Sequence, residues 1–594
     1  YIGHTHNGFT IFSPENKTLK NFMPSPQNKN SLPGNTVYSI FVDANSKIWI
    51  ATNRGLSLFD PFREIFRNFK DINGMHHTMQ GVVNCVYKTS DGQIWVGTIS
   101  DLCYFDSKDT DLILSGKKNI NHMFIQDIYW GISNPTVYSI FEDSFKNVWI
   151  GSNGGGASFI SSTSSFFHSW KINKIPGVIN GLNDKEVLTI CVADNGDIWM
   201  GTDGGGINVN KDGKNYRFYS HDTGEITSNA YYSSLKDSNG DLWFGDVEID
   251  IFLSKENRFI HYTPLRNNSV IRCLFEDNQR NIWIGNSSGL EICNLTTKKK
   301  ELLNKENSQL LTNEIRAISQ DKNGNIWIGT LNKGITIYNS KHKTMKHINE
   351  HTIFEECAIN QIFRDSKNRI WVATTEGLVL FPNEQLDTYQ VFNTLNGLAC
   401  NLVCSIEEDS ENNIWLSTHS GISCFLDSEK RFLNYDHKNG TLFGTYMNNS
   451  VGKTQDGAIY FGSINGVCYF YPNDRPSNII LPPVIFTEFK VYGRNPREDA
   501  IDISIPMADG KVTLNYNQNI FNITFNVMNK SLQRRVEYAY KLEGLEKNWI
   551  NIGEENQVAF RNIPHRNYKL HIKARYKNQE WQNNYSTLII NINP

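Results

Sequence analysis

The side chains most able to bind a ligand recur at one position of this sequence, eleven residues before a repeated aromatic residue. In chain order, this position holds Tyr38, Asn84, Tyr138, Leu188, Tyr232, Arg272, Arg316, Asn360, Cys404 and Asn449. The residue after it is small in nine of ten cases, whereas this position varies widely and is mostly polar. Such variation beside a uniform position indicates a recognition surface.

Three of these side chains have the chemistry to hold a sugar. A pyranose has an apolar face and a rim of hydroxyl groups, so an aromatic ring and fixed amides bind it together. Tyr232 would supply the ring, and Asn360 and Asn449 would supply the amides.

Arg272 and Arg316 come from successive repeats and admit two interpretations. In the first, they grip a carboxylate or sulfate of a ligand with bidentate geometry. In the second, they form salt bridges with the protein itself. The residue types alone leave both interpretations open.

Trp130 is a separate candidate, because it lies in the longest insertion between repeats, just before Asn134-Pro135. An exposed tryptophan in a loop suits a sugar platform or a protein anchor. The alternative is that Trp130 packs against its own loop.

No catalytic or metal-binding motif accompanies these residues. The sequence has no G-x-S-x-G or H-E-x-x-H pattern, and its histidines lack partners at metal-ligand spacing. The run Asp237-Ser238-Asn239-Gly240-Asp241 resembles a calcium loop, but its glycine stands fourth instead of sixth. We therefore expect no catalytic residue, no metal site and no cofactor. Paired carboxylates that meet only in space keep a glycosidase or polysaccharide lyase open as an alternative.

An internal repeat must position the candidate residues. An aromatic residue with aliphatic neighbours, usually followed by glycine, recurs 40 to 54 residues apart. Its eleven members are Tyr1, Trp49, Trp95, Trp149, Trp199, Trp243, Trp283, Trp327, Trp371, Trp415 and Tyr460. This period is typical of a four-stranded propeller blade. The preceding Asp and Gly residues predict a hairpin turn, and a later aromatic strand places Trp170 in the core.

Composition excludes several classes of protein. The chain has 594 residues, enough for about four domains at ~150 residues each. Lys plus Arg number 58 against 61 Asp plus Glu, and this net charge of -3 disfavours nucleic acid as a partner. No run of ~18 apolar residues is present, so we expect neither a transmembrane helix nor a signal peptide in this sequence.

The repeat stops after Tyr460, and a linker follows at Tyr471-Pro472-Asn473-Asp474-Arg475-Pro476. From Val484 onward, about seven short strands are expected, a pattern typical of a small immunoglobulin-like sandwich. This part contains Tyr538-Ala539-Tyr540-Lys541-Leu542-Glu543-Gly544-Leu545.

Repeats of the form Asn-x-[Ile/Val]-x-Ser-Ile-x-x-Asp…Ile-Trp-Ile-Gly-Thr…Gly-Leu, followed by that Tyr-x-Tyr-Lys-Leu-x-Gly-Leu segment, resemble the periplasmic sensor region of hybrid two-component system proteins. In that family, two seven-bladed regulator propellers precede a Y_Y_Y domain, a transmembrane helix, a cytoplasmic histidine kinase and a DNA-binding regulator. The resemblance implies a periplasmic, non-enzymatic region that senses an oligosaccharide from glycan breakdown and controls transcription through the kinase. We also expect a homodimer, tethered to the membrane in the parent protein, with no nucleic-acid contact by this region.

The repeat count predicts three domains. Seven blades lie between Trp199 and Tyr460, which leaves four for a first propeller. We expect a partial propeller over residues 1–160, a seven-bladed propeller over 161–476 and the sandwich over 477–594. The first propeller would then lack about 130 residues, three blades of ~44. A protein-interaction scaffold is a further alternative, and it would show a large apolar patch on one propeller face.

Overall fold

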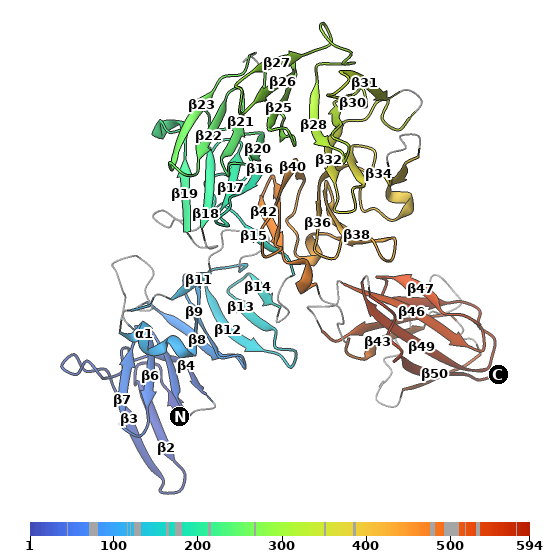
Figure 1. Ribbon diagram of the computed structural model, residues 1–594. Helices are drawn as coiled ribbons and strands as arrows, with labels where there is room; N and C mark the ends of the chain where they lie inside the picture. The colour runs from blue at the N-terminus through green and yellow to red at the C-terminus, as the bar shows by residue number, and fades with distance from the viewer. Residues whose placement is uncertain are drawn as a thin grey trace. The chain divides into compact units, whose positions relative to one another are not determined.

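The chain is built almost entirely from antiparallel β-sheets (Figure 1). The computed structural model describes all residues except 44–45, 70–80, 116, 119, 124–131, 162–165, 173–180, 212–214, 266–268, 350–351, 384–387, 476–480, 492–509, 517, 519, 530–534 and 578. Propeller blades are followed by a β-sandwich, which confirms the predicted fold class. Tyr1–Ser164 and Ser165–Leu481 fall into different compact units. The helical segments described are short: α1 (Thr110–Leu114), η1 (Ser107–Asp109), η2 (His221–Thr223), η3 (Thr394–Asn396), η4 (His437–Asn439) and η5 (Pro472–Asp474). None of the helices in the described chain has the length and apolar composition needed to span a membrane.

Four sheets make up the first 160 residues, here called the four-bladed region. They are β1 (Ile2–Gly3), β2 (Phe9–Ser13) and β3 (Thr18–Phe22); β4 (Val37–Val42), β5 (Ile48–Thr52), β6 (Gly55–Asp60) and β7 (Ile65–Asn68); β8 (Val83–Lys88), β9 (Gln93–Thr98), β10 (Leu102–Asp106) and β11 (Asn121–Met123); and β12 (Val137–Glu142), β13 (Val148–Ser152) and β14 (Gly156–Ile160). Successive sheets are neighbours, because β4 contacts β1 and β8, and β8 contacts β12.

Seven sheets make up the second propeller, here called the seven-bladed ring. Six of them are β16 (Val187–Val192), β17 (Ile198–Thr202), β18 (Ile207–Lys211) and β19 (Asn215–Tyr219); β20 (Ser233–Lys236), β21 (Leu242–Gly245), β22 (Ile249–Leu253) and β23 (Arg258–Tyr262); β24 (Cys273–Glu276), β25 (Asn281–Asn286), β26 (Gly289–Asn294) and β27 (Lys300–Leu303); β28 (Ile315–Gln320), β29 (Ile326–Thr330), β30 (Ile335–Asn339) and β31 (Thr344–Ile348); β32 (Ile359–Arg364), β33 (Ile370–Thr374), β34 (Leu378–Phe381) and β35 (Gln390–Phe392); and β36 (Val403–Glu408), β37 (Ile414–Thr418), β38 (Gly421–Leu426) and β39 (Arg431–Tyr435). The seventh contains β40 (Tyr446–Lys453), β41 (Ile459–Ser463), β42 (Gly466–Phe470) and β15 (His168–Trp170).

The ring is closed by a strand from its own beginning. β15 pairs antiparallel with β42, so that Trp170 lies opposite Val467. The innermost strands contact one another in the order β16, β20, β24, β28, β32, β36 and β40, and β40 contacts β16 again. Figure 1 shows these sheets arranged around a central axis.

The position of Trp170 shows which sheet its strand completes. Trp170 is buried, as predicted from its place in an aromatic strand. However, that strand does not complete the sheet of Trp149, which contains β12, β13 and β14. It instead supplies the outer strand of the sheet of Tyr460, and the indole packs against Tyr460 and Tyr469.

The repeated Asp and Trp residues are linked by hydrogen bonds that explain their spacing. Asp321 Oδ1 accepts the backbone N–H groups of Asn323 and Asn325, each at 2.9 Å. Its Oδ2 accepts the indole N–H of Trp327 at 3.2 Å. The same indole bond to an Asp six residues earlier occurs at Trp149, Trp243, Trp283, Trp371 and Trp415. One carboxylate therefore fixes the turn and also pairs the buried indole N–H.

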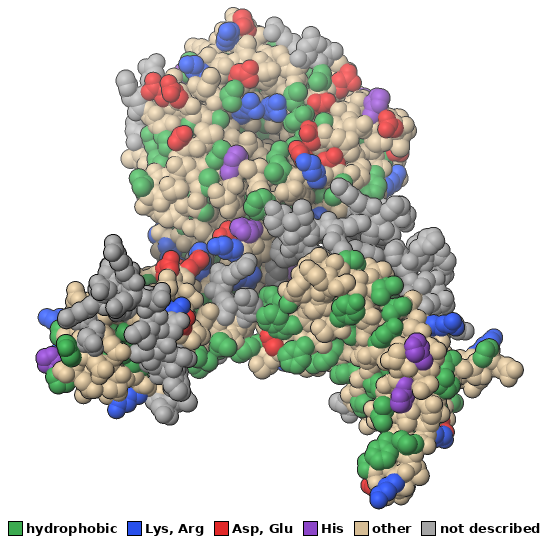
Figure 2. All heavy atoms as spheres, turned by 180° about the vertical axis from the view of Figure 1, so that it is seen from behind, with side chains coloured by type: hydrophobic (Ala, Val, Ile, Leu, Met, Phe, Trp, Pro, Cys, Tyr) green, Lys and Arg blue, Asp and Glu red, His purple; other side chains and the backbone are tan. Residues whose placement is uncertain are grey.

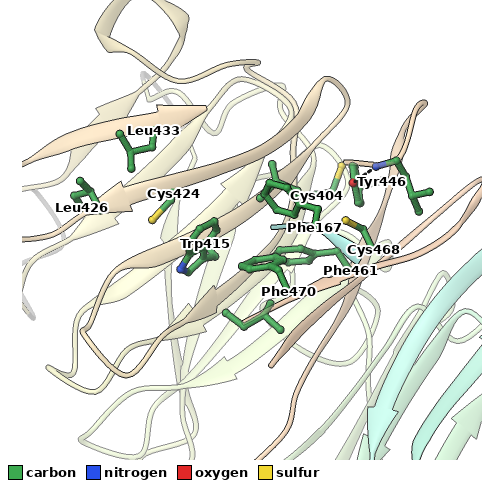
Figure 3. Packing of buried hydrophobic residues seen from close by; sticks show 13 residues of the cluster. Phe167, Cys404, Trp415, Cys424, Leu426, Leu433, Tyr446, Phe461, Cys468 and Phe470 are labelled. Atoms are coloured by element: carbon green, nitrogen blue, oxygen red, sulfur yellow. Dashed lines mark hydrogen bonds between the residues drawn. The ribbon is translucent and has the colours of Figure 1, made fainter. Parts of the chain in front are cut away.

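The tryptophans hold neighbouring sheets together. Trp415 on β37 packs against Phe470 on β42 of the next sheet, with ring centroids 4.5 Å apart (Figure 3). Phe167, Cys404 and Phe461 belong to the same core cluster. Burial of such large apolar groups is the main force that stacks one blade on the next.

The C-terminal sandwich has two sheets. One has the order β43 (Val484–Val491), β45 (Phe521–Val527), β48 (Gln557–Phe560), and the other has the order β44 (Lys511–Leu514), β50 (Ser586–Ile592), β49 (Asn567–Tyr576), β46 (Val536–Glu543), β47 (Ile550–Gly553). Alternate residues of β49 are buried, including Leu570 and Ile572. Tyr538 is buried in the core, whereas Tyr540 is partly exposed.

Candidate functional site

A β-bulge aims the side chain that lies eleven residues before the repeated aromatic. In β28, Ile315 pairs with Thr330 and Ala317 with Gly329, so the register skips Arg316. The same skip occurs at Tyr38, Asn84, Tyr138, Leu188, Asn360 and Cys404. A bulged residue leaves the regular alternation of the strand and can be redirected. In these seven repeats, a β-bulge therefore sets the direction of the side chain at this position.

Two further candidates lie just before the first residue of an inner strand. The backbone N–H of Tyr232 donates to the carbonyl of Gly245, and that of Arg272 donates to the carbonyl of Gly285, both at 2.9 Å. These bonds fix the two residues at the ends of β20 and β24, at the same level as the bulges.

Five of the six predicted site residues line one cavity at the mouth of the seven-bladed ring. This mouth cavity has a volume of about 140 Å³. Its lining consists of Leu188, Tyr232, Arg272, Arg316, Ile359, Asn360, Met447, Asn448 and Asn449. The sixth candidate, Trp130, lies outside the residues that the structure describes.

Tyr232 and Arg272 form a stacked pair in the mouth cavity. The guanidinium carbon of Arg272 lies 4.7 Å from the centroid of the Tyr232 ring, within cation–π range. The Tyr232 hydroxyl donates to Asp203 Oδ1 at 3.4 Å. Burial, and then the charge of Asp203, raise the pKa of Tyr232. The phenol therefore stays neutral and acts as a hydrogen-bonding group.

Arg316 lies near Arg272, and no described carboxylate is within ion-pair distance of either guanidinium. Neither guanidinium has an ion pair or a side-chain hydrogen bond with any part of the chain that the structure describes. Arg316 Nε is shielded from solvent and has no hydrogen-bond partner among the described residues. Burial, and then the charge of Arg272, lower the pKa of Arg316. Salt bridges within the protein, the second interpretation of this pair, are thus not found among the described residues.

Asn360 and Asn449 are held in the mouth cavity in different ways. Asn360 donates one amide proton to the carbonyl oxygen of Val403, in the next inner strand, at 2.7 Å. Its side chain is thus partly a strut between blades. Asn449 has a left-handed backbone conformation, with φ of 56°, inside the irregular stretch of β40 between Tyr446 and Val451. Asparagine tolerates this conformation better than most residues.

Four residues that line the mouth cavity were not among the predicted site residues. Leu188 held the predicted position but was not selected, because it is apolar. Ile359 lines the cavity because it directly precedes Asn360 in β32. Met447 and Asn448 are brought in by the irregular pairing of β40, for which the repeat spacing gives no signal.

A second cavity of about 390 Å³ adjoins the mouth cavity, and the two share Asn449. Glu407 lies in its wall, with Lys453 Nζ at 3.9 Å. Burial raises the pKa of Glu407 to about 7, against the opposing charge of Lys453. The described lining of the mouth cavity contains no carboxylate, and that of the second cavity contains only Glu407. A carboxylate pair for glycoside hydrolysis is therefore not present in these two described linings.

Other site types receive no support from the described surface. No cluster of three His, Cys, Asp or Glu side chains with metal-binding geometry occurs in the part of the chain that is described. On the face visible in Figure 2, basic and acidic side chains are interspersed instead of forming one basic patch. A surface that binds the phosphate backbone of a nucleic acid would instead carry one continuous basic patch.

Comparison with known proteins identifies the two kinds of module. Two-component regulator propeller repeats match residues 31–54, 79–100, 131–154, 181–204, 264–288 and 309–332. The Y_Y_Y domain matches residues 529–593. The chain is similar to the crystal structure of the extracellular domain of hybrid two-component system BT3049 from B. thetaiotaomicron, with 37% identity and a TM-score of 0.84. That similarity covers 100% of this chain and 76% of the other.

One curated relative is named as a histidine kinase. Histidine kinase P4 of Formosa agariphila is 28% identical over 166 residues, which are 27% of this chain. The match covers 12% of the length of that kinase.

Proposed function

This chain belongs to the family of extracellular sensor regions of hybrid two-component systems, and we propose that it is a non-catalytic receptor region that binds an oligosaccharide from glycan breakdown. The extracellular domains to which it is similar place it outside the cytoplasm. The domains of the proposed receptor are a partial propeller, the seven-bladed ring as ligand-binding part and the sandwich as the link to the membrane.

One observation carries the proposal. Tyr232, Arg272, Arg316, Asn360 and Asn449 come from five different inner strands or their starting points, yet they line one concave cavity. An aromatic ring, amides and unpaired cations in one cavity supply a stacking surface and directed hydrogen bonds, which sugar recognition requires. The cavity is smaller than the ~300–1,000 Å³ of common small-molecule sites, so it suits one sugar unit of a longer ligand.

Signal transfer follows from differential binding. A ligand shifts a receptor between two states only if its affinity differs between them. In the proposed receptor, a homodimer held at the membrane would change its geometry when the mouth cavity is filled, and a histidine kinase in the parent protein would respond. The kinase activity is assigned to the parent protein as part of this proposal.

Calorimetric titration with a size-graded library of glycan fragments tests the function. At least one fragment should bind, and Tyr232→Ala should lower its affinity by about tenfold, worth ~1.4 kcal/mol. Tyr138→Ala is the matched control, because Tyr138 holds the same repeat position in the four-bladed region and is 57% exposed. The proposal fails if no fragment binds, if a fragment is turned over, or if the two substitutions have equal effects.

A further inference from the structure

Two cationic side chains share the mouth cavity without a counter-charge within ion-pair distance in the described chain. Both Arg272 and Arg316 are partly buried, and the charge of Arg272 already acts on Arg316. Two like charges that lose water without gaining a partner destabilise each other. A buried donor without an acceptor, such as Arg316 Nε, adds to this cost.

Elsewhere the ring supplies carboxylates to a buried arginine. Arg369 Nε lies 2.5 Å from Asp365 Oδ2, and its Nη1 lies 2.7 Å from Asp427 Oδ1. Asp427 also contacts Lys367 and Lys430. Arg369 is therefore paired on two sides, unlike the two arginines in the mouth cavity.

Nearby carboxylates limit how many anionic groups Arg272 and Arg316 can bind. Glu314 acts on Arg316 only from beyond ion-pair distance. Asp203 and Asp246 lie on the side of Tyr232, where their charges raise the pKa of the phenol. Asp203 already accepts the Tyr232 hydroxyl, and Asp246 accepts the Ser228 hydroxyl. A second anionic group near Tyr232 would meet these carboxylates, so the arrangement favours one anion, placed between the arginines.

Resting on the proposed function, we infer that Arg272 and Arg316 form an anion subsite for a single carboxylate or sulfate ester on the sugar unit that enters the mouth cavity. The planar guanidinium groups match either oxyanion with two parallel N–H···O bonds each. Asn449 and the free amide hydrogen of Asn360 remain for the sugar hydroxyls. The neutral ring of Tyr232, held by Arg272, forms one wall.

Matched pairs of ligands test this subsite in calorimetric titrations. One pair is an oligogalacturonide and its methyl ester, which has the same sugar units but carries no carboxylate charge. The other is a disaccharide of galactose and N-acetylglucosamine, which carries no uronate, with and without a sulfate ester. Neutral glycan fragments of the same lengths are titrated in parallel. We expect the charged member of at least one pair to bind at least tenfold more tightly than its neutral partner, and the pair that responds identifies carboxylate or sulfate.

Two substitutions assign the effect to the arginines. Arg272→Gln and Arg316→Gln should each weaken the charged ligand by about 10- to 100-fold, the range expected for hydrogen bonds to a charged group. Arg258→Gln removes the same charge from the exposed outer strand β23 and should change the affinity less than twofold. If neutral fragments bind as well as charged ones and the two variants are unaffected, the inference is overturned while the proposed function stands. If no fragment binds at all, both fail.

Thermal unfolding without ligand separates a binding role from a structural one. Arg272→Gln and Arg316→Gln should leave the unfolding temperature unchanged or raise it, since each relieves an unpaired like-charge contact. Arg369→Gln should lower it, because Asp365 and Asp427 lose their partner. A decrease for the mouth-cavity variants as large as that for Arg369→Gln would overturn the inference by showing that the pair supports the fold.

Discussion

The four-bladed region and the seven-bladed ring are made from the same repeat, but the inner strands β4 and β12 of the four-bladed region are far less buried than β16 and β36 of the ring. In the four-bladed region β8, which contacts β4 and β12, is the inner strand that is buried. In the four-bladed region, β4 leaves Tyr38 52% exposed and β12 leaves Tyr138 57% and Phe141 59% exposed. In the ring, nearly every residue of β16 and β36 is buried. Each inner strand of the ring has a neighbour on both sides, because β40 contacts β16. Closure of the ring, and not the repeat itself, creates a cavity at the axis.

The bulge position shows what closure adds to chemistry. Tyr38, Tyr138 and Tyr232 hold the same place in their repeats. The first two are exposed, whereas Tyr232 is partly buried under the guanidinium group of Arg272 from the next blade. A neighbouring blade therefore turns a surface tyrosine into the wall of a cavity.

The largest expected difference between the two regions concerns the repeated tryptophan. Trp415→Ala should destabilise the ring by about 3–5 kcal/mol, as for large buried aromatics, because the Trp415 indole is 1% exposed and packs on Phe470. Trp149→Ala should cost clearly less, since Trp149 is only partly buried. Both indoles bond an Asp, at 2.8 and 2.9 Å, so this bond does not distinguish them. Equilibrium urea unfolding measures both, and equal costs would contradict the comparison.

Glu407 should give the ring a pH effect between pH 4.5 and 7. The pKa of Glu407 is raised from 4.5 to about 7, so the folded state favours its protonated form. Its contribution to stability is full below pH 4.5 and is lost as the pH rises through 7, by about 3 kcal/mol. The corresponding place in the four-bladed region holds Phe141, which does not titrate.

Glu407→Gln should therefore flatten the pH dependence of the free energy of unfolding of the ring between pH 4.5 and 7. Urea unfolding at half-unit pH steps provides the measurement, and Glu429→Gln on the exposed surface is the control. An unchanged slope in Glu407→Gln would show that this carboxyl group is ionised in the folded ring.

The glycine after the aromatic gives a smaller contrast. A Cβ on Gly285 would lie 2.5 Å from Cys273 Sγ and 2.7 Å from Ile315 Cγ2 in the next blade. Gly285→Ala should thus cost about 2 kcal/mol through overpacking. A Cβ on Gly151 would crowd only the hydroxyl of Ser139, which is exposed and can rotate. Gly151→Ala should cost under ~1 kcal/mol, and calorimetric unfolding of both variants would reveal a reversed order.

The repeat allowed much of this to be predicted. Hairpin turns, the repeated aromatic residue and the variable position eleven residues before it are local features, and each recurs with the period of Trp283 or Trp327. The partner of Trp170 was not predictable, because residue spacing does not tell which distant strand closes a ring. The place of Met447 in the cavity lining was not predictable for a related reason, because its strand, β40, departs from the regular pairing. The missing counter-charge of Arg316 depends on the three-dimensional neighbourhood alone.

The smallest expected effect is one that the two regions should share. Asn84 donates its amide to the carbonyl of Val137 at 2.9 Å, just as Asn360 donates to that of Val403 at 2.7 Å. Loss of one such buried bond costs about 1 kcal/mol, so Asn84→Ala and Asn360→Ala should destabilise their regions equally in urea unfolding. Only Asn360→Ala should also weaken a sugar ligand, because only Asn360 lines the mouth cavity. If Asn360→Ala lowers stability but leaves the affinity intact, the amide is a strut between blades in both regions, and closure has added nothing to its chemistry.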